Sequence, residues 1–256
     1  MLKGYMGDEG AQIHYREIAP QLKTYNRPLL CLPPAPHSGS FFESVMPKLN
    51  QDRGVVAIDY PGYGGSDRGK AISIQAYAKA LNSLMEAIGP VDLLGFHTGS
   101  LVAAEIVKLH TEQVGRVVMV DVPFFKEETR QSYISNLPQD VAPESVQESF
   151  EKSVINRSVA ISKTRAFELW VEGLRSGAFK QDAFRAAFAY DAQAEFSRIN
   201  NKISIIATQS DLLESSREAA KSIPQASLVE YPDISAPVFE AQTEVIAEAI
   251  LAALTE

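Results

Sequence analysis

The sequence contains little cysteine and little histidine, and this narrows the chemistry that it can support. One cysteine and four histidines occur in 256 residues. Cys31 lies in the apolar run LLCL, so it is expected to be buried in a strand, and a single cysteine excludes a disulfide within the chain. Neither His-Glu-x-x-His nor Cys-x-x-Cys occurs in the sequence. We therefore expect no dedicated metal site, and the composition favours a reducing, cytoplasmic setting.

Long apolar runs and an excess of positive charge are also missing. No segment approaches the ~18 uninterrupted apolar residues of a membrane span, and the first residues, MLKGYMGDEGAQ, lack the apolar core of a secretory signal. Lys and Arg number 24 against 32 Asp and Glu, which gives a formal net charge of −8. Binding to nucleic acid or to an anionic membrane is therefore not expected. A small-molecule substrate remains as the expected partner, and we expect a monomer or a homodimer.

Strand and helix patterns alternate along most of the chain, as in an α/β protein. Apolar strand patterns occur at residues 2–6, 11–18, 29–32, 55–58, 91–95, 117–120, 203–207 and 228–231. Helical spacing predicts one helix over residues 74–88, with Ser73 as its cap and Gly89 as its end. The alternation stops after Asp121 for about eighty residues of helical pattern. This order indicates a parallel sheet covered by helices on both faces, with a helical insertion after the sixth strand.

Four short stretches occur at the ends of predicted strands. PPAPHSGSFF follows the third strand, DYPGYGGSD the fourth and GFHTG the fifth, and ATQSDLL closes the seventh. In this order they resemble the α/β-hydrolase fold family over nearly the whole chain. The resemblance implies a mostly parallel sheet of eight strands, a core formed by residues 1–123 and 196–256, and a helical cap formed by residues 124–195. It also implies hydrolase-like activity without a cofactor.

The stretch GFHTG has the spacing of a nucleophile elbow, a turn that carries Ser, Cys or Asp in most enzymes of this type. A strand that turns abruptly into a helix forces its apex residue into a strained backbone conformation and exposes its side chain. Gly95 and Gly99 flank the apex because a Cβ there would clash where strand and helix cross. The apex residue is His97, a residue type that tolerates positive φ better than most. We predict His97 as the catalytic centre; an ordinary turn between strand and helix is the alternative.

The loop after the third strand is predicted to complete an oxyanion hole. The family usually has His-Gly there, whereas this chain has two prolines, Pro33 and Pro34, without N–H groups. The amide groups of Ala35 and Thr98 could still stabilise an oxyanion, although the prolines could instead serve only to stiffen the loop. His37, in the same loop, is predicted to face the pocket and bind substrate, with a merely solvated loop histidine as the alternative.

The sequence departs from the family pattern near its end. The family places a catalytic histidine after the eighth strand, but VEYPDISAPVFEAQTEVIAEAI contains none. Alignment of the last helices puts Ser235 at that position, with Asp233 as the alternative if the register shifts. Asp211 occupies the usual position of the catalytic acid, and Asp121 occupies the alternative position that some members use.

Three interpretations of this centre remain open. His97, oriented by Ser235 or Asp211, could act as a general base or as a nucleophile on a small, largely apolar ester or carbonyl substrate. It could instead be the base of a lyase or isomerase, or the pocket could only bind a ligand. An aromatic residue of the insertion, Trp170, is predicted to contact the substrate. The two remaining histidines, His14 and His110, are interpreted as structural. We expect a hydrolase-like enzyme with an atypical centre, because a polar, titratable residue is retained at the apex.

Overall fold

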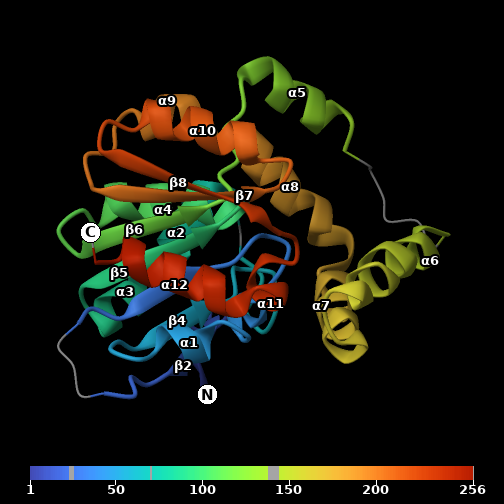
Figure 1. Ribbon diagram of the computed structural model, residues 1–256, viewed down its shortest axis with the longest axis horizontal. Coiled ribbons are helices and arrows are strands. Elements are labelled where there is room, and N and C mark those ends of the chain that lie inside the picture. The colour runs from blue at the N-terminus through green and yellow to red at the C-terminus, as the bar shows by residue number, and fades with distance from the viewer. Residues whose placement is uncertain (23–25, 70, 138–143, 256) are drawn as a thin grey trace.

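An eight-stranded sheet forms the centre of the protein in a computed structural model, which describes all residues except 23–25, 70, 138–143 and 256 (Figure 1). The strands are β1 (Leu2–Met6), β2 (Ile13–Ile18), β3 (Leu29–Leu32), β4 (Val55–Ile58), β5 (Val91–Phe96), β6 (Val114–Val120), β7 (Ile203–Gln209) and β8 (Ala226–Ser235). Their order is β1-β2-β4-β3-β5-β6-β7-β8. The pairs β1–β2 and β2–β4 are antiparallel, and the pairs from β4 to β8 are parallel. The predicted mostly parallel sheet is confirmed.

Helices cover both faces of the sheet, and each face has its own apolar core. One face packs against α2 (Ile74–Ala80), α3 (Asn82–Ile88), α4 (Thr98–Leu109), α9 (Ala192–Phe196) and α10 (Leu213–Ser222). The other packs against α1 (Met46–Leu49), α11 (Val238–Ala241) and α12 (Thr243–Ala253). Strands β3 and β4, LLCL and VVAI, are continuous apolar runs because they are buried between these two layers.

The segment between β6 and β7 is helical, as its sequence pattern predicts. It contains α5 (Glu127–Ser135), α6 (Glu144–Phe150), the π-helical turn η2 (Glu151–Ile155), η3 (Arg157–Val159), α7 (Lys163–Arg175), η4 (Gly177–Phe179) and α8 (Lys180–Ala189). Figure 1 shows α6 and α7 grouped at the right of the view, apart from the strands. Arg165 of α7 fastens this group to the rest of the protein. Its guanidinium donates to the Ser40 carbonyl and to Glu240 of α11, each at 2.8 Å.

One predicted helix is divided in two. The helix expected over residues 74–88 is interrupted at Leu81, whose N–H bonds to the Ala78 carbonyl in a tighter turn. Its predicted ends are confirmed: the Ser73 hydroxyl accepts the Ala76 N–H at 3.0 Å, and Gly89 ends α3 at φ 75°. The spacing of apolar residues continues through this break, which is why the sequence pattern did not reveal it.

The turn DYPGYGGSD is built around a buried carboxylate. Asp59, at the end of β4, accepts hydrogen bonds from His14, from Arg16 and from the Gly39 amide, each at 2.8 Å. Gly64 lies at φ 55°, and a Cβ there would approach Asp59 Oδ2 to 2.1 Å. This network joins β2, β4 and the loop after β3, and it places His14 in the structural role that the sequence indicated.

Within the described residues, no helix is long and apolar enough to cross a membrane.

Candidate active site

Most of the predicted site residues lie around one cavity of about 590 Å³ at the carboxyl edge of the parallel strands. The strand ends contribute Ala35 and His37 after β3, His97 after β5, Asp121 after β6, Asp211 after β7 and Ser235 at the end of β8. The insertion contributes Arg157, Leu169 and Phe184. Ligands of open α/β sheets bind at this edge, because the loops that follow neighbouring strands meet there. The topology therefore brings together side chains that are up to 200 positions apart in the sequence.

His97 occupies a strained turn between β5 and α4. Its backbone lies at φ 49° and ψ −117°, and its N–H donates to the Val120 carbonyl at 3.1 Å. A Cβ on Gly99 would lie 2.0 Å from the Leu32 carbonyl oxygen, and one on Gly95 would lie 2.6 Å from the Gly99 carbonyl oxygen. The two glycines therefore permit the close crossing of strand and helix that exposes the His97 side chain to the cavity.

The imidazole of His97 lies in an apolar environment. Its ring centroid is 4.0 Å from that of Phe96, which stacks on Phe41 at 5.4 Å. Burial lowers the pKa of His97 from 6.5 to about 4, because a charged imidazolium loses its hydration there. The ring is thus uncharged at neutral pH, so one nitrogen carries a hydrogen and the other keeps a free lone pair. Among the described residues, no side chain forms a hydrogen bond with this ring.

The two candidate acids have different environments. Asp121 is fully buried at φ 49°, and its carboxylate accepts the Thr208 N–H at 2.7 Å and the Thr208 hydroxyl at 2.6 Å. Burial raises the pKa of Asp121, and hydrogen bonds from Thr208 and Ser210 partly offset this effect. Asp211 is exposed, and its side chain has no hydrogen-bond partner in the described part of the chain. Both carboxylates line the cavity, and within the described residues neither forms a hydrogen bond with the His97 ring.

Ser235, and not Asp233, lines the cavity at the end of β8. The residues after it, Ala236 and Pro237, continue the same wall. The Ser235 hydroxyl has no partner among the described side chains and backbone groups, so it is free to bind a ligand or water. Asp233 is exposed, and its carbonyl accepts from Gln242 at 2.8 Å.

The two residues predicted to stabilise an oxyanion, Ala35 and Thr98, differ in their position relative to the cavity. Ala35 lines the cavity, whereas Thr98 is the buried first residue of α4 directly behind His97 and does not line it. Neither amide hydrogen has an acceptor within the described residues. An unpaired N–H at the first position of a helix is normal, and it presents a partial positive charge.

His37 and Arg157 join this cavity to a smaller one of about 170 Å³, which is lined by the insertion and by the loop after β3. His37 lines both cavities, and its Nδ1 is buried without a hydrogen-bond partner in the residues described. Burial lowers the pKa of His37 to about 4, and the nearby charges of Arg157 and Lys180 act in the same direction. Trp170 lines the smaller cavity and not the one at His97. Its Nε1 donates to the Ser149 hydroxyl at 3.0 Å, which turns the indole toward α6.

Arg157 is the residue of this cavity that sequence reasoning missed. It lies in the short turn η3, where no motif or periodic pattern marks it. Most aromatic residues of the insertion have structural positions instead; Phe124, for example, packs against Phe196 in the core. Among the described residues of the insertion, Phe184 is the aromatic side chain that lines the His97 cavity.

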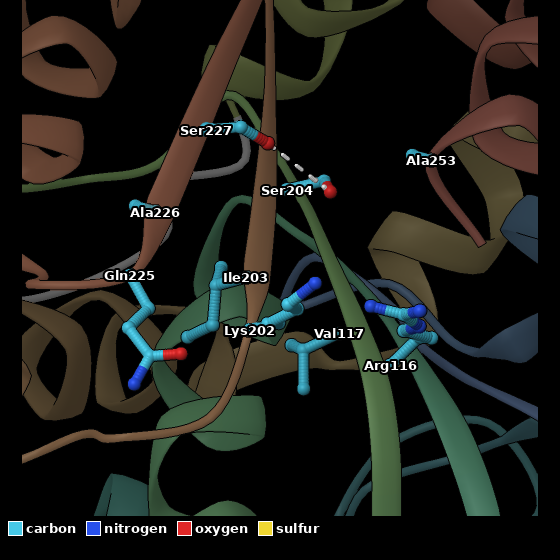
Figure 2. Close-up of a pocket in the computed structure, with 9 residues that line it drawn as sticks. All are labelled: Arg116, Val117, Lys202, Ile203, Ser204, Gln225, Ala226, Ser227 and Ala253. Atoms are coloured by element: carbon cyan, nitrogen blue, oxygen red, sulfur yellow. Dashed lines mark hydrogen bonds between the residues drawn. The ribbon is translucent and has the colours of Figure 1, made fainter. Parts of the chain in front are cut away.

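A second depression, of about 380 Å³, lies at the opposite edge of the sheet, where β6, β7 and β8 begin (Figure 2). Figure 2 shows Arg116, Lys202 and the hydrogen-bonded hydroxyls of Ser204 and Ser227 around it. None of its lining residues is a histidine or a carboxylate. It therefore offers no general base, and the cavity at His97 is the stronger candidate for the active site. No group of three or more His, Cys, Asp or Glu side chains suited to a metal ion occurs in the described part of the chain.

Comparison with known proteins agrees with this fold. Residues 27–239 match the alpha/beta hydrolase fold family. The esterase RhEst1 from Rhodococcus sp. ECU1013 superposes with a TM-score of 0.82 at 16% identity, covering 100% of this chain and 99% of the esterase. At this identity the likeness shows the fold.

Two curated relatives match over shorter segments. The pimeloyl-[acyl-carrier protein] methyl ester esterase of Neisseria meningitidis is 33% identical over 73 residues, which are 28% of each chain. The pyrrolizixenacetamide deacetylase of Xenorhabdus hominickii is 33% identical over 100 residues, which are 38% of each chain. The matched segments thus span about a third of these relatives.

Proposed function

Since the chain belongs to the α/β-hydrolase fold family, we propose that it hydrolyses small, largely apolar carboxyl esters without a cofactor, using His97 in place of the usual nucleophile. The observation that carries this proposal is the uncharged ring of His97, which lies at a strained turn and faces a cavity at the carboxyl edge of the sheet. The names of the two curated relatives, an ester esterase and a deacetylase, support transfer of an acyl group to water.

The proposed reaction begins with proton transfer to His97. The ring nitrogen with the free lone pair takes a proton from a water molecule while that water adds to the ester carbonyl carbon. The carbonyl oxygen becomes an oxyanion, and the amide hydrogens of Ala35 and Thr98 are proposed to stabilise it. A hydroxyl nucleophile is not required, which agrees with the absence of serine at the apex.

The second step uses the proton that His97 has taken. The tetrahedral intermediate collapses, the bond to the alkoxy group breaks, and the departing oxygen receives the proton from the imidazolium. Because burial lowers the pKa of His97 to about 4, the imidazolium is more acidic than an ordinary one and returns its proton readily. The His97 ring is then uncharged again, and the carboxylic acid and the alcohol leave the cavity.

Ser235 and Asp211 are proposed to position the attacking water. Both line the cavity, and neither side chain is engaged by another described group. Asp121 is held by Thr208, so we propose a structural role for its carboxylate. We also propose that residues 124–195 act as a cap on the core of residues 1–123 and 196–256, because Leu169 and Phe184 of this segment close the apolar wall of the cavity.

The function is tested by incubating the wild-type protein with p-nitrophenyl acetate or p-nitrophenyl butyrate in ¹⁸O-labelled water and measuring the products. Hydrolysis releases p-nitrophenol and places one ¹⁸O atom in each molecule of acid. An acyl adduct that accumulates in the intact mass of the wild type, but not of His97→Ala, would show that His97 attacks the ester itself. No turnover of either ester, together with binding of the acids, would support a binding protein. Conversion of a carbonyl compound without ¹⁸O uptake would support a lyase or isomerase.

A further inference from the structure

Two positively charged side chains line the smaller cavity, and among the described residues no negatively charged side chain lines it. Arg157 from η3 and Lys180 from the start of α8 both line it, and both are partly buried. None of its lining residues is Asp or Glu. Within the described residues, neither cation forms an ion pair, although the chain as a whole carries a net charge of −8.

The acidic residues on the neighbouring helices are already engaged elsewhere. Glu168 pairs with Arg165 at 3.3 Å, Glu172 with Arg175 at 3.7 Å and Asp182 with Arg185 at 3.2 Å. In each of these i,i+3 pairs the carboxylate binds a cation of its own helix, and it pairs with neither Arg157 nor Lys180. A partly buried guanidinium without a counter-ion is unfavourable, because burial removes its hydration without supplying a partner.

The polar groups around the two cations suit an anion. Ser149 and Ser153 line the same cavity, and hydroxyl groups can donate to an anionic oxygen. Arg157 also lines the His97 cavity, so one molecule can reach both sites. The buried, unpartnered Nδ1 of His37 lies where the two cavities meet. Gly173 lies beside this histidine, since a Cβ there would make an ordinary contact of 3.6 Å with His37 Cε1.

We propose that the natural ligand is a small carboxylate-bearing ester whose carboxylate binds Arg157 and Lys180 while its ester carbonyl lies beside His97. The guanidinium fork can bind both carboxylate oxygens, and the ammonium adds a second charge. Leu169 and Phe184 line both cavities, so they contact the apolar part of the molecule between its two polar ends. This inference rests on the proposed function only for the position of the ester group.

Binding can be measured without turnover, which separates this inference from the proposed function. Benzoate and benzamide have nearly the same shape and differ in charge, so titration calorimetry of the wild-type protein with each compares an anion with its neutral counterpart. Inorganic phosphate is titrated in parallel. We expect benzoate to bind about 10-fold or more tightly than benzamide, because a hydrogen bond to a charged group contributes more than one between neutral groups.

Three variants locate the bound anion. Arg157→Gln and Lys180→Gln are each expected to weaken benzoate binding about 10-fold. Lys163→Gln removes an exposed cation at the start of α7 that lines neither cavity, and it should leave benzoate binding unchanged. Thermal unfolding of each variant verifies the fold. Equal affinity for benzoate and benzamide, binding of phosphate alone, or equal weakening by all three substitutions would overturn the inference.

Discussion

Thr208 holds both carboxylate oxygens of Asp121, with its N–H at 2.7 Å from Oδ1 and its hydroxyl at 2.6 Å from Oδ2. The two residues end neighbouring strands, β6 and β7, so this contact joins the two loops that form one wall of the cavity. A carboxylate engaged in this way has less capacity to orient His97. The strained backbone of Asp121, at φ 49°, is maintained by the same contact.

Asp121→Asn is therefore expected to lower the free energy of unfolding. The amide oxygen can still accept the Thr208 N–H, but the Thr208 hydroxyl must rotate to accept from the NH₂ group, and two charge-assisted hydrogen bonds become neutral ones. We expect a loss of about 1–3 kcal/mol in urea unfolding near neutral pH. Asp211→Asn is the matched control, because Asp211 is exposed and should change stability by less than about 0.5 kcal/mol. Equal stability of the two variants would contradict a structural role for Asp121.

The two cavity histidines should make the protein sensitive to mild acid. The pKa of His37 and of His97 is about 4 in the folded protein and near 6.5 in the unfolded chain. Between these values the unfolded chain binds protons that the folded protein does not, so the free energy of unfolding falls as pH falls through this window. Each histidine contributes on the order of 1 kcal/mol per pH unit there.

Urea unfolding from pH 7 to pH 5 measures this effect. A His37→Gln, His97→Gln double variant lacks both titrating groups and should lose less stability over this range than the wild type. The comparison between the two proteins removes the contribution of the carboxylates, which both share. Parallel pH profiles of the two proteins would show that the histidines titrate normally.

Activity should depend on pH in the same sense. His97 accepts a proton in the proposed step, so the enzyme is active above the pKa of His97 and inactive below it. With that pKa at about 4, kcat/KM should stay level on lowering the pH through 6.5 and fall only near 4. Rates from pH 4 to 8, with circular dichroism at each pH to verify folding, give the profile. An inflexion near 6.5 would show that His97 is not buried as described.

Ser235→Ala should slow ester hydrolysis, whereas Asp233→Ala should not. Ser235 lines the cavity with an unengaged hydroxyl, and Asp233 is exposed outside it. Loss of one hydrogen bond to the attacking water should lower kcat about 10-fold. Steady-state kinetics of both variants with p-nitrophenyl butyrate measure the difference. A larger effect from Asp233→Ala would indicate that the loop after β8 adopts the other register during the reaction.

Local sequence patterns predict much of the fold and the backbone at the apex. His97, Gly95 and Gly99 could be placed from a few adjacent residues, because the crossing of strand and helix restricts each of them. The Asp59 network likewise lies within a turn that the sequence marks clearly.

Features that depend on contacts between distant segments could not be predicted. Arg157 lies in a short turn without any pattern, and only the packing of the insertion brings it to the cavity. Trp170 has helical spacing in the sequence, which does not say which of two neighbouring cavities it lines. The choice between Asp121 and Asp211 depends on Thr208, and no spacing rule connects these residues.

The rate of p-nitrophenyl butyrate hydrolysis by His97→Ala, relative to wild type near neutral pH, tests the central claim most directly. Ala at this position removes the ring and leaves the backbone turn, and His97→Ser tests whether a hydroxyl at the apex can replace the imidazole. We expect His97→Ala to be slower by about 100-fold or more, because a positioned general base contributes at least that much. Equal rates for wild type and a folded His97→Ala protein would contradict the account.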